Sequence, residues 1–309
     1  MKNLIISSLL VFSSIAAHAI DIPKGFKQEK VQINGFNMNI YKGGQGEPVV
    51  LLHGMGESAL MWEPVMKALA AKYTLIVPDL RGGGLSDAPE TGYSKVEMAA
   101  DVKVLLDHYG IPQAHIVGHD IGLMVAYAFA AKYPQSTKTL VVMDAFLPGV
   151  GPGDDIYNSP DIWHFRFYGK NAENLVKGRE KQYLDHLWTT FSADPKTFPE
   201  AKKDYFSRQY AAPGHMRAAM AWFKAFPQDA KDNRELSKKQ LPMPVLSIGG
   251  EKAMGAPLAA TMKIVAPQAE GLTLKNTGHW LMEENPKATI EALDQFLAKH
   301  KQTVAQAAH

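Results

Sequence analysis

A strand that passes directly into a helix is predicted by the segment His115-Ile116-Val117-Gly118-His119-Asp120-Ile121-Gly122. Glycine lies on both sides of the tight turn, where neighbouring backbone leaves no room for side chains. The spacing Gly118-x-Asp120-x-Gly122 is that of a nucleophile elbow, which exposes its central residue at the top of a sheet. The usual central residue is serine, so the aspartate at position 120 indicates a different reaction.

A carboxylate attacks without a base, because it is already ionised at neutral pH. We expect Asp120 to attack a saturated carbon that carries ring strain or a leaving group, and to form an ester. Hydrolysis of this ester requires a base that activates water. The predicted base is His279, in the segment Asn276-Thr277-Gly278-His279-Trp280 after the last expected strand.

The predicted base needs an acid that fixes its tautomer and stabilises its charged form. Asp144 ends the strand that follows the elbow helix, and we predict that it is this charge-relay acid. Glu251, which follows Gly249-Gly250, is the alternative.

An oxyanion site is predicted by His53-Gly54-Met55-Gly56, where small residues after a strand expose backbone N–H groups. The N–H groups of Met55 and Ile121 are expected to hold the charge that develops on Asp120 during hydrolysis. The same loop also matches a dinucleotide-binding pattern, with Asp79 at the end of the next strand. A hairpin precedes this loop's strand, and the elbow motif set accounts for the loop better, so we favour the hydrolytic interpretation.

Strands and helices alternate from Val49 to Met143, which predicts a parallel sheet with helices on both sides. Before this region, apolar and polar residues alternate around Asn34-Gly35 and predict a hairpin. The strand pattern stops between residues 147 and 235, where aromatic, charged and proline residues are frequent. Helices are expected there over residues 171–190, 200–210 and 215–226, and the sheet pattern resumes at Val245.

We therefore expect an α/β core of residues 20–146 and 236–301, a helical cap of residues 147–235, and a flexible tail of residues 302–309. A further helix is expected over residues 58–71. The chain has 309 residues, of which 46% are hydrophobic and 21% charged, so it can bury a full core.

The net charge of +2 and the lack of long charge runs argue against nucleic acid as a partner. The absence of cysteine excludes disulfides and thiolate metal sites. We expect a small-molecule substrate, with no cofactor and no metal ion.

Residues 1–19 have the pattern of a secretory signal peptide. Lys2 is followed by an apolar stretch from Leu4 to Ile15, and Ala17-His18-Ala19 forms the expected cleavage site. The apolar stretch is too short for the ~20 residues of a membrane-spanning helix. The sequence therefore predicts export, to the periplasm or by secretion, without stable membrane insertion.

The chain resembles the α/β-hydrolase superfamily and, within it, the epoxide-hydrolase branch. It is most similar to the exported bacterial type represented by the cystic fibrosis transmembrane conductance regulator inhibitory factor. The likeness runs from about residue 25 to residue 297 and includes Lys42–Gly46, His53–Gly56, Gly118–Gly122, Trp163–Phe165 and Gly278–Leu281. The resemblance implies a mostly parallel eight-stranded sheet with an inserted cap. It also supports Asp144 as the relay acid and leaves a homodimer as a possibility.

In the family, two cap residues hydrogen-bond the epoxide oxygen as the ring opens, and in the exported type they are His and Tyr. His164 matches the first, which implies that it is the ring-opening donor. The second position is Phe223, in Ala221-Trp222-Phe223-Lys224, so a phenol is missing. Candidates to replace it are Tyr157, Tyr168, Tyr205 and Tyr210. Residues expected to bind the substrate are His53, Trp163, Trp222, Phe223 and Trp280.

The resemblance implies hydrolysis of small apolar epoxides to vicinal diols through an Asp120 ester. A dehalogenase that uses the same ester is one alternative, in which His164 and Trp222 hold a halide. Haloalkane enzymes place Trp after the nucleophile and haloacid enzymes place Arg there, whereas this chain has Ile121. A catalytically weak binding protein on the same fold is the other alternative, suggested by Phe223.

Overall fold

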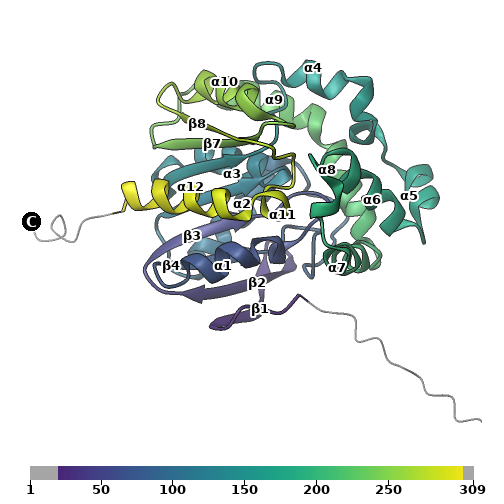
Figure 1. Ribbon diagram of the computed structural model, residues 1–309, viewed down its shortest axis with the longest axis horizontal. Helices are drawn as coiled ribbons and strands as arrows, with labels where there is room; N and C mark the ends of the chain where they lie inside the picture. Colours follow the sequence, from purple (N-terminus) through teal and green to yellow (C-terminus); the bar gives the residue numbers. More distant parts are fainter. Residues whose placement is uncertain (1–19, 302–309) are drawn as a thin grey trace, which may run out of the picture.

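An eight-stranded sheet forms the centre of the molecule, with the strand order β1-β2-β4-β3-β5-β6-β7-β8 (Figure 1). The computed structural model describes residues 20–301, so the predicted signal peptide and tail lie outside the described residues. The strands are β1 (Phe26–Ile33), β2 (Phe36–Gly44), β3 (Glu47–Leu52), β4 (Tyr73–Pro78), β5 (Ala114–His119), β6 (Thr137–Met143), β7 (Val245–Gly250) and β8 (Glu270–Leu274). Strand β2 runs antiparallel to β1 and β4, and the other pairs are parallel. This arrangement confirms the predicted mostly parallel sheet.

The hairpin between β1 and β2 has the predicted turn. Ile33 pairs with Phe36, so the turn consists of Asn34 and Gly35 alone. Both turn residues have positive φ, 42° and 86°. A two-residue turn of this kind suits the right-handed twist of the strands, and asparagine followed by glycine adopts it readily.

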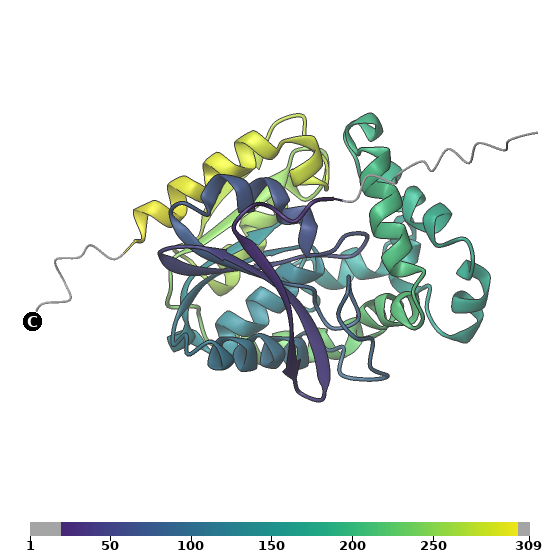
Figure 2. The same ribbon diagram turned by 90° about the horizontal axis from the view of Figure 1, so that it is seen from below.

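Helices cover both faces of the sheet. Those of the core are α1 (Glu63–Leu69), α2 (Lys95–His108), α3 (Ile121–Lys132), α10 (Gly255–Val265), α11 (Leu281–Glu284) and α12 (Pro286–Lys299). Figures 1 and 2 place α1 and α12 together on one face, and α2 and α3 on the other. Every residue of β5 is buried, as expected for a strand covered on both faces.

A helical cap lies beside the sheet in both views, between β6 and β7 in the chain (Figures 1 and 2). Its helices are α4 (Gly153–Asn158), α5 (Lys170–Val176), α6 (Glu180–Thr190), α7 (Glu200–Tyr210), α8 (His215–Lys224) and α9 (Phe226–Leu236), and a 3₁₀ segment, η3, spans Pro160–Arg166.

Three predicted helices have different limits in the structure. The single helix expected over residues 171–190 is wrong, because Gly178 adopts a φ of 77° between α5 and α6. The helix expected over residues 215–226 ends at Lys224, and α9 begins at Phe226 with a proline in its first turn. The helix expected over residues 58–71 is a 3₁₀ turn, Ala59–Trp62, followed by the shorter α1.

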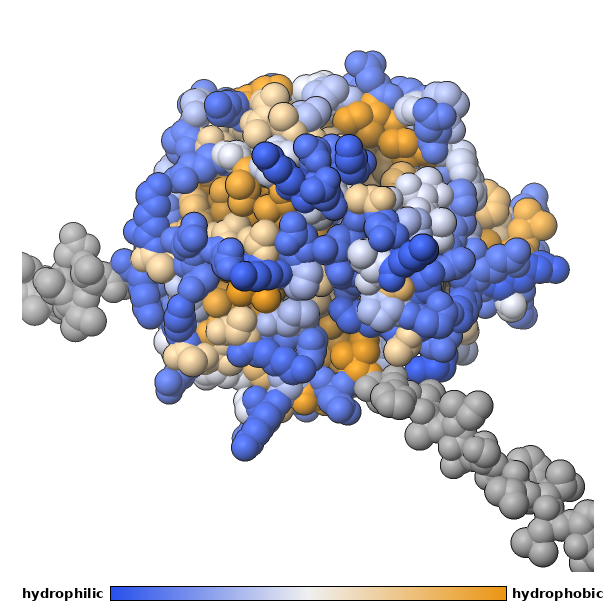
Figure 3. Space-filling view, viewed as in Figure 1, coloured by the Kyte–Doolittle hydropathy of each residue, from blue (hydrophilic) through white to orange (hydrophobic). Residues whose placement is uncertain are grey.

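The face seen in Figure 3 is covered mainly by hydrophilic residues, with hydrophobic residues in small separate areas. Between residues 20 and 301, no helix combines the length and the apolar character that a membrane crossing needs.

A buried ion pair joins the start of α2 to α9. The Nζ atom of Lys95 donates to Asp229 Oδ2 at 2.7 Å and to the backbone oxygen of Trp222 at 2.7 Å. The other Asp229 oxygen accepts from the Lys95 backbone N–H at 2.8 Å. Because both side chains are almost fully buried, each charge is compensated by the charge of its partner and not by water.

We expect Lys95→Met to lower the free energy of unfolding by about 3–5 kcal/mol, because it leaves the Asp229 carboxylate buried without a cation. Urea denaturation of the purified protein measures this loss. Lys103→Met is the matched control, since Lys103 forms an exposed pair with Asp107 on the same helix. An equal loss in both variants would contradict the explanation.

Candidate active site

Asp120 lies at the turn between β5 and α3, with φ 52° and ψ −121°. A non-glycine residue rarely adopts a positive φ, so the surrounding structure must enforce it. A Cβ atom on Gly118 would lie 2.1 Å from the Gly122 oxygen, and one on Gly122 would lie 2.3 Å from the Leu52 oxygen. The two glycines therefore allow α3 to approach the sheet and hold Asp120 at its exposed turn.

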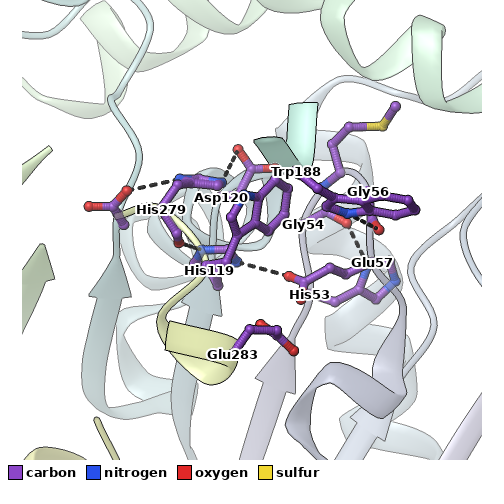
Figure 4. Close-up of polar contacts among 12 residues, drawn as sticks. His53, Gly54, Gly56, Glu57, His119, Asp120, Trp188, His279 and Glu283 are labelled. Atoms are coloured by element: carbon purple, nitrogen blue, oxygen red, sulfur yellow. Dashed lines mark hydrogen bonds and ion pairs between the residues drawn. The ribbon is translucent and has the colours of Figure 1, made fainter. Parts of the chain in front are cut away.

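The two oxygens of the Asp120 carboxylate have different surroundings (Figure 4). The Met55 N–H, one of the two predicted oxyanion donors, donates to Oδ1 at 2.7 Å. The other predicted donor, Ile121, is the first residue of α3, next to Asp120. Oδ2 lies 3.7 Å from Nε2 of His279. One oxygen is therefore held by backbone, while the other faces the imidazole.

His279 is held by Asp144 through its other ring nitrogen. Nδ1 lies 2.8 Å from Asp144 Oδ2 and donates in this bond, while Nε2 faces Asp120. The second oxygen of Asp144 accepts from the N–H groups of Gly250 at 2.8 Å and Met254 at 3.1 Å. Asp144 is fully buried after the end of β6, so its carboxylate has a fixed position.

Glu251, the alternative relay acid, does not contact His279. Its Oε2 accepts from the Asn276 N–H at 3.0 Å, in an exposed part of the loop. The structure thus brings Asp120, His279 and Asp144 together and leaves Glu251 as a loop contact.

The carboxylates around His279 control its pKa. Burial alone would lower this pKa, but the hydrogen bond and the charge of Asp144 raise it. The charges of Asp120 and Glu284 act in the same direction, so the pKa of His279 is raised above its ordinary 6.5.

A cavity of about 250 Å³ lies over these residues, between core and cap. It is lined by Met55, Asp120, Asp144, Ala145, Phe146, Ile156, Ile162, His164, Phe165, Leu187, Phe191, Phe223, Ala253, Met254, His279 and Trp280. The lining contains no lysine or arginine, and its polar side chains are two aspartates, two histidines and the indole of tryptophan. Such a cavity accepts a small, apolar and uncharged molecule.

The cap contributes His164 and Phe223 to this cavity. His164 belongs to η3 and is buried, and burial together with the charge of His279 lowers its pKa to about 3. The imidazole is therefore neutral at physiological pH and can donate one hydrogen bond. The rings of His164 and Phe223 lie 5.5 Å apart, so these two residues form one wall.

Three of the residues expected to bind substrate lie outside the cavity lining. Trp163 is 40% exposed and packs against His186. The Trp222 indole donates to the Arg81 backbone oxygen at 3.1 Å, and His53 Nε2 accepts from the Leu80 N–H at 2.9 Å.

Two of these residues lie outside the lining because their side chains point away from the cavity. Trp222 precedes Phe223 on one helix and points to a different side, and Trp163 likewise points away from the cavity that His164 lines. Trp280 lines the cavity, and its role in substrate binding stays a prediction.

None of the four tyrosines proposed to replace the missing phenol lines the cavity. The Tyr210 hydroxyl accepts from the Gly56 N–H at 2.9 Å and donates to the Glu57 backbone oxygen at 3.1 Å. Tyr157 packs against Phe226. Among the cap residues that line the cavity, His164 is therefore the only one whose side chain can donate a hydrogen bond.

A buried polar group beneath the site was missed by the sequence analysis. His119 Nε2 donates to the His279 backbone oxygen at 2.8 Å, and His119 Nδ1 lies 3.5 Å from Glu57 Oε2. Burial and the charge of Glu283 raise the pKa of Glu57 well above 4.5, and burial lowers that of His119. Glu57 lies four residues after His53 in an otherwise small and apolar loop, and this isolated acid is the signal that sequence offered.

Within residues 20–301, no cluster of three or more histidine or carboxylate side chains is arranged to hold a metal ion.

We expect the imidazole of His279 to titrate above 6.5 and Asp144→Asn to lower its pKa, because the substitution removes the adjacent negative charge. Proton NMR of the histidine resonances measures both pKa values, and His279→Gln assigns the signal. Glu251→Gln is the control that leaves the pKa in place. A larger change with Glu251→Gln than with Asp144→Asn would identify Glu251 as the partner in solution.

Residues 47–286 match the family described as alpha/beta hydrolase fold. The soluble epoxide hydrolase of Corynebacterium sp. (strain C12) is 33% identical over 87% of this chain and 96% of that protein. The fluoroacetate dehalogenase of Burkholderia sp. is 25% identical over 92% of this chain and 97% of its own length. The crystal structure of Cfl2 from Burkholderia cenocepacia is 33% identical, with a TM-score of 0.81 over 88% of this chain and 96% of that chain. The chain therefore belongs to the α/β-hydrolase family, in its epoxide-hydrolase branch.

Proposed function

We propose that this protein hydrolyses small, uncharged epoxides to vicinal diols through an ester on Asp120. The observation that carries the proposal is the placement of the Asp120 carboxylate in an apolar cavity, with Nε2 of His279 3.7 Å from Oδ2. A carboxylate nucleophile next to a base suits a reaction that forms an ester and then hydrolyses it. The relative named soluble epoxide hydrolase supports the choice of epoxide.

In the first step, Oδ2 of Asp120 attacks a ring carbon. A carbon–oxygen bond forms to Asp120, the strained ring carbon–oxygen bond breaks, and the ring oxygen takes up a proton from water. The neutral His164 imidazole donates a hydrogen bond to this oxygen as its negative charge develops. The product is a hydroxyalkyl ester of Asp120.

In the second step, His279 removes a proton from water, and the water oxygen attacks Cγ of Asp120. The negative charge then develops on Oδ1, where the Met55 N–H already donates at 2.7 Å. Asp144 stabilises the protonated imidazole until the bond from Cγ to the alkylated oxygen breaks. The diol leaves with the proton from His279, which regenerates the neutral imidazole. The new Asp120 carboxyl group gives up its remaining proton, which neutralises the hydroxide left by the first step, and the carboxylate is regenerated.

Formation of the ester lowers the pKa of His279. The negative charge of Asp120 is one of the charges that raise the pKa of His279. Esterification removes this charge, so the pKa of His279 falls when the imidazole must be neutral to accept a proton.

The cavity favours neutral substrates over haloacids. A haloacid carries a carboxylate, and no lysine or arginine lines the cavity to pair with it. Ile121, after Asp120, also offers no charge. Dehalogenation of uncharged haloalkanes uses the same ester, so the following experiment includes it.

We expect His279→Gln to accumulate the ester, because the variant retains Asp120 but lacks the base. Intact-mass spectrometry after incubation with a panel of small epoxides should show a gain equal to the whole epoxide. A gain equal to a haloalkane minus hydrogen halide, with no gain from epoxides, would replace the proposal with dehalogenation. Asp120→Asn in the His279→Gln background is the control that forms no adduct.

A folded His279→Gln protein that forms no adduct with any compound would contradict ester chemistry and favour a binding role. Circular dichroism of the same sample establishes that the variant is folded.

We expect Phe223→Tyr to raise kcat/KM for epoxides by about tenfold, because it adds a hydroxyl donor beside His164 in the cavity wall. Initial rates of diol formation measure the change. Phe146→Tyr adds the same hydroxyl elsewhere in the lining and serves as the matched control. An unchanged or lower rate in Phe223→Tyr would mean that the epoxide oxygen does not lie between these two residues.

A further inference from the structure

Two acidic residues directly after the histidine loop connect that loop to the cap. The loop consists of residues 278–280, and Glu283 and Glu284 end the short helix α11 that follows it. Each side chain makes a different contact with the cap. The following inference rests on the proposed two-step reaction.

The Glu284 carboxylate binds backbone on both sides of His279. Oε2 accepts from the Gly278 N–H at 2.9 Å, and Oε1 accepts from the Trp280 N–H at 3.1 Å. Oε2 also accepts from the N–H of Ala193 at 2.7 Å, and Ala193 lies in the cap between α6 and α7. One carboxylate thus holds the histidine loop and the cap together.

The same cap segment also contacts His279 directly. The His279 N–H donates to the Phe191 backbone oxygen at 2.8 Å. A Cβ atom on Gly278 would lie 2.4 Å from the Ala193 nitrogen and 2.6 Å from the Phe191 oxygen. The absence of a side chain at position 278 therefore permits this close approach between loop and cap.

Glu283 makes a second connection, to another part of the cap. Its carboxylate pairs with Lys202 Nζ at 2.6 Å, and Lys202 belongs to α7. The Glu283 side chain is fully buried. Burial alone would lower the pKa of Lys202, but the charge of Glu283 raises it. The cap thus supplies the cation that a buried carboxylate of the histidine loop requires, and removing that cation is strongly unfavourable.

We propose that Glu283 and Glu284 form a latch, so that the position of His279 depends on the contact between the histidine loop and the cap. In the proposed reaction, Asp120 forms the ester and His279 hydrolyses it. The latch holds only the second of these residues, so it acts on ester hydrolysis. Both glutamates are positioning residues, since they bind backbone and Lys202 and do not line the cavity.

Glu284→Gln tests this inference, because an amide group has one oxygen and cannot accept on both sides. We expect ester formation to stay within about twofold of wild type and ester hydrolysis to slow about ten- to hundredfold, as for a displaced catalytic group. Rapid quench followed by intact-mass spectrometry gives both rates. Glu291→Gln, at an exposed position on α12, is the matched control and should change neither rate.

Hydrogen exchange gives a second readout that needs no substrate. In Glu284→Gln, exchange should accelerate in peptides that cover residues 191–193 and 278–280, and not elsewhere in the core. Lys202→Met acts from the cap side alone and should produce the same exchange pattern and the same slow ester hydrolysis. If Glu284→Gln fails to fold, the same two measurements on Lys202→Met test the inference.

Equal slowing of both steps in the latch variants, or wild-type hydrolysis of the ester with unchanged exchange, would overturn the latch. Failure of the proposed function has a different outcome, since no adduct would then form in His279→Gln. The two failures are therefore distinguishable.

Discussion

The close contact between α3 and the sheet determines the geometry of the whole site. Gly118 and Gly122 have no side chains, so the first turn of α3 lies against the backbone that follows β3. This contact forces Asp120 into a strained conformation that the packed glycines maintain. It also places the carboxylate beside the Met55 N–H, because Met55 follows the same strand. The Asp120 carboxylate is therefore positioned by backbone packing and by a backbone N–H group, before any side chain contributes.

Sequence predicts the parts of this molecule that depend on local backbone requirements. The elbow glycines, the Asn34-Gly35 turn and the alternation of strands and helices are such parts, because each needs particular residue types at short spacing. The direction of a cap side chain depends instead on how its helix is rotated against its neighbours. Sequence therefore named Trp222 and Phe223 together, although only Phe223 lines the cavity. The partner of His279 also required the structure, since Asp144 and Glu251 both follow strands of the same sheet edge.

Backbone amides compensate the charges of the two aspartates in the site. Met55 compensates one oxygen of Asp120, and Gly250 and Met254 compensate Asp144. Backbone donors carry no net charge and do not attract anionic ligands as lysine or arginine would. Burial lowers the pKa of His164 to about 3 and raises the pKa of Glu57 beneath the site. Both aspartates are therefore compensated without a lysine or arginine, and the rest of the cavity lining is largely apolar.

Phe191 connects the cavity to the loop that carries His279. Its side chain lines the cavity, and its backbone oxygen accepts from the His279 N–H. The segment that contains Phe191 also supplies the Ala193 N–H to Glu284. One segment of the cap therefore contacts both the cavity and the loop that carries His279. Asp120 is held instead by the Met55 N–H, and the neighbouring Gly56 N–H donates to Tyr210 of the cap. In the proposed reaction, the residue that forms the ester and the residue that hydrolyses it are therefore connected to the cap through different contacts.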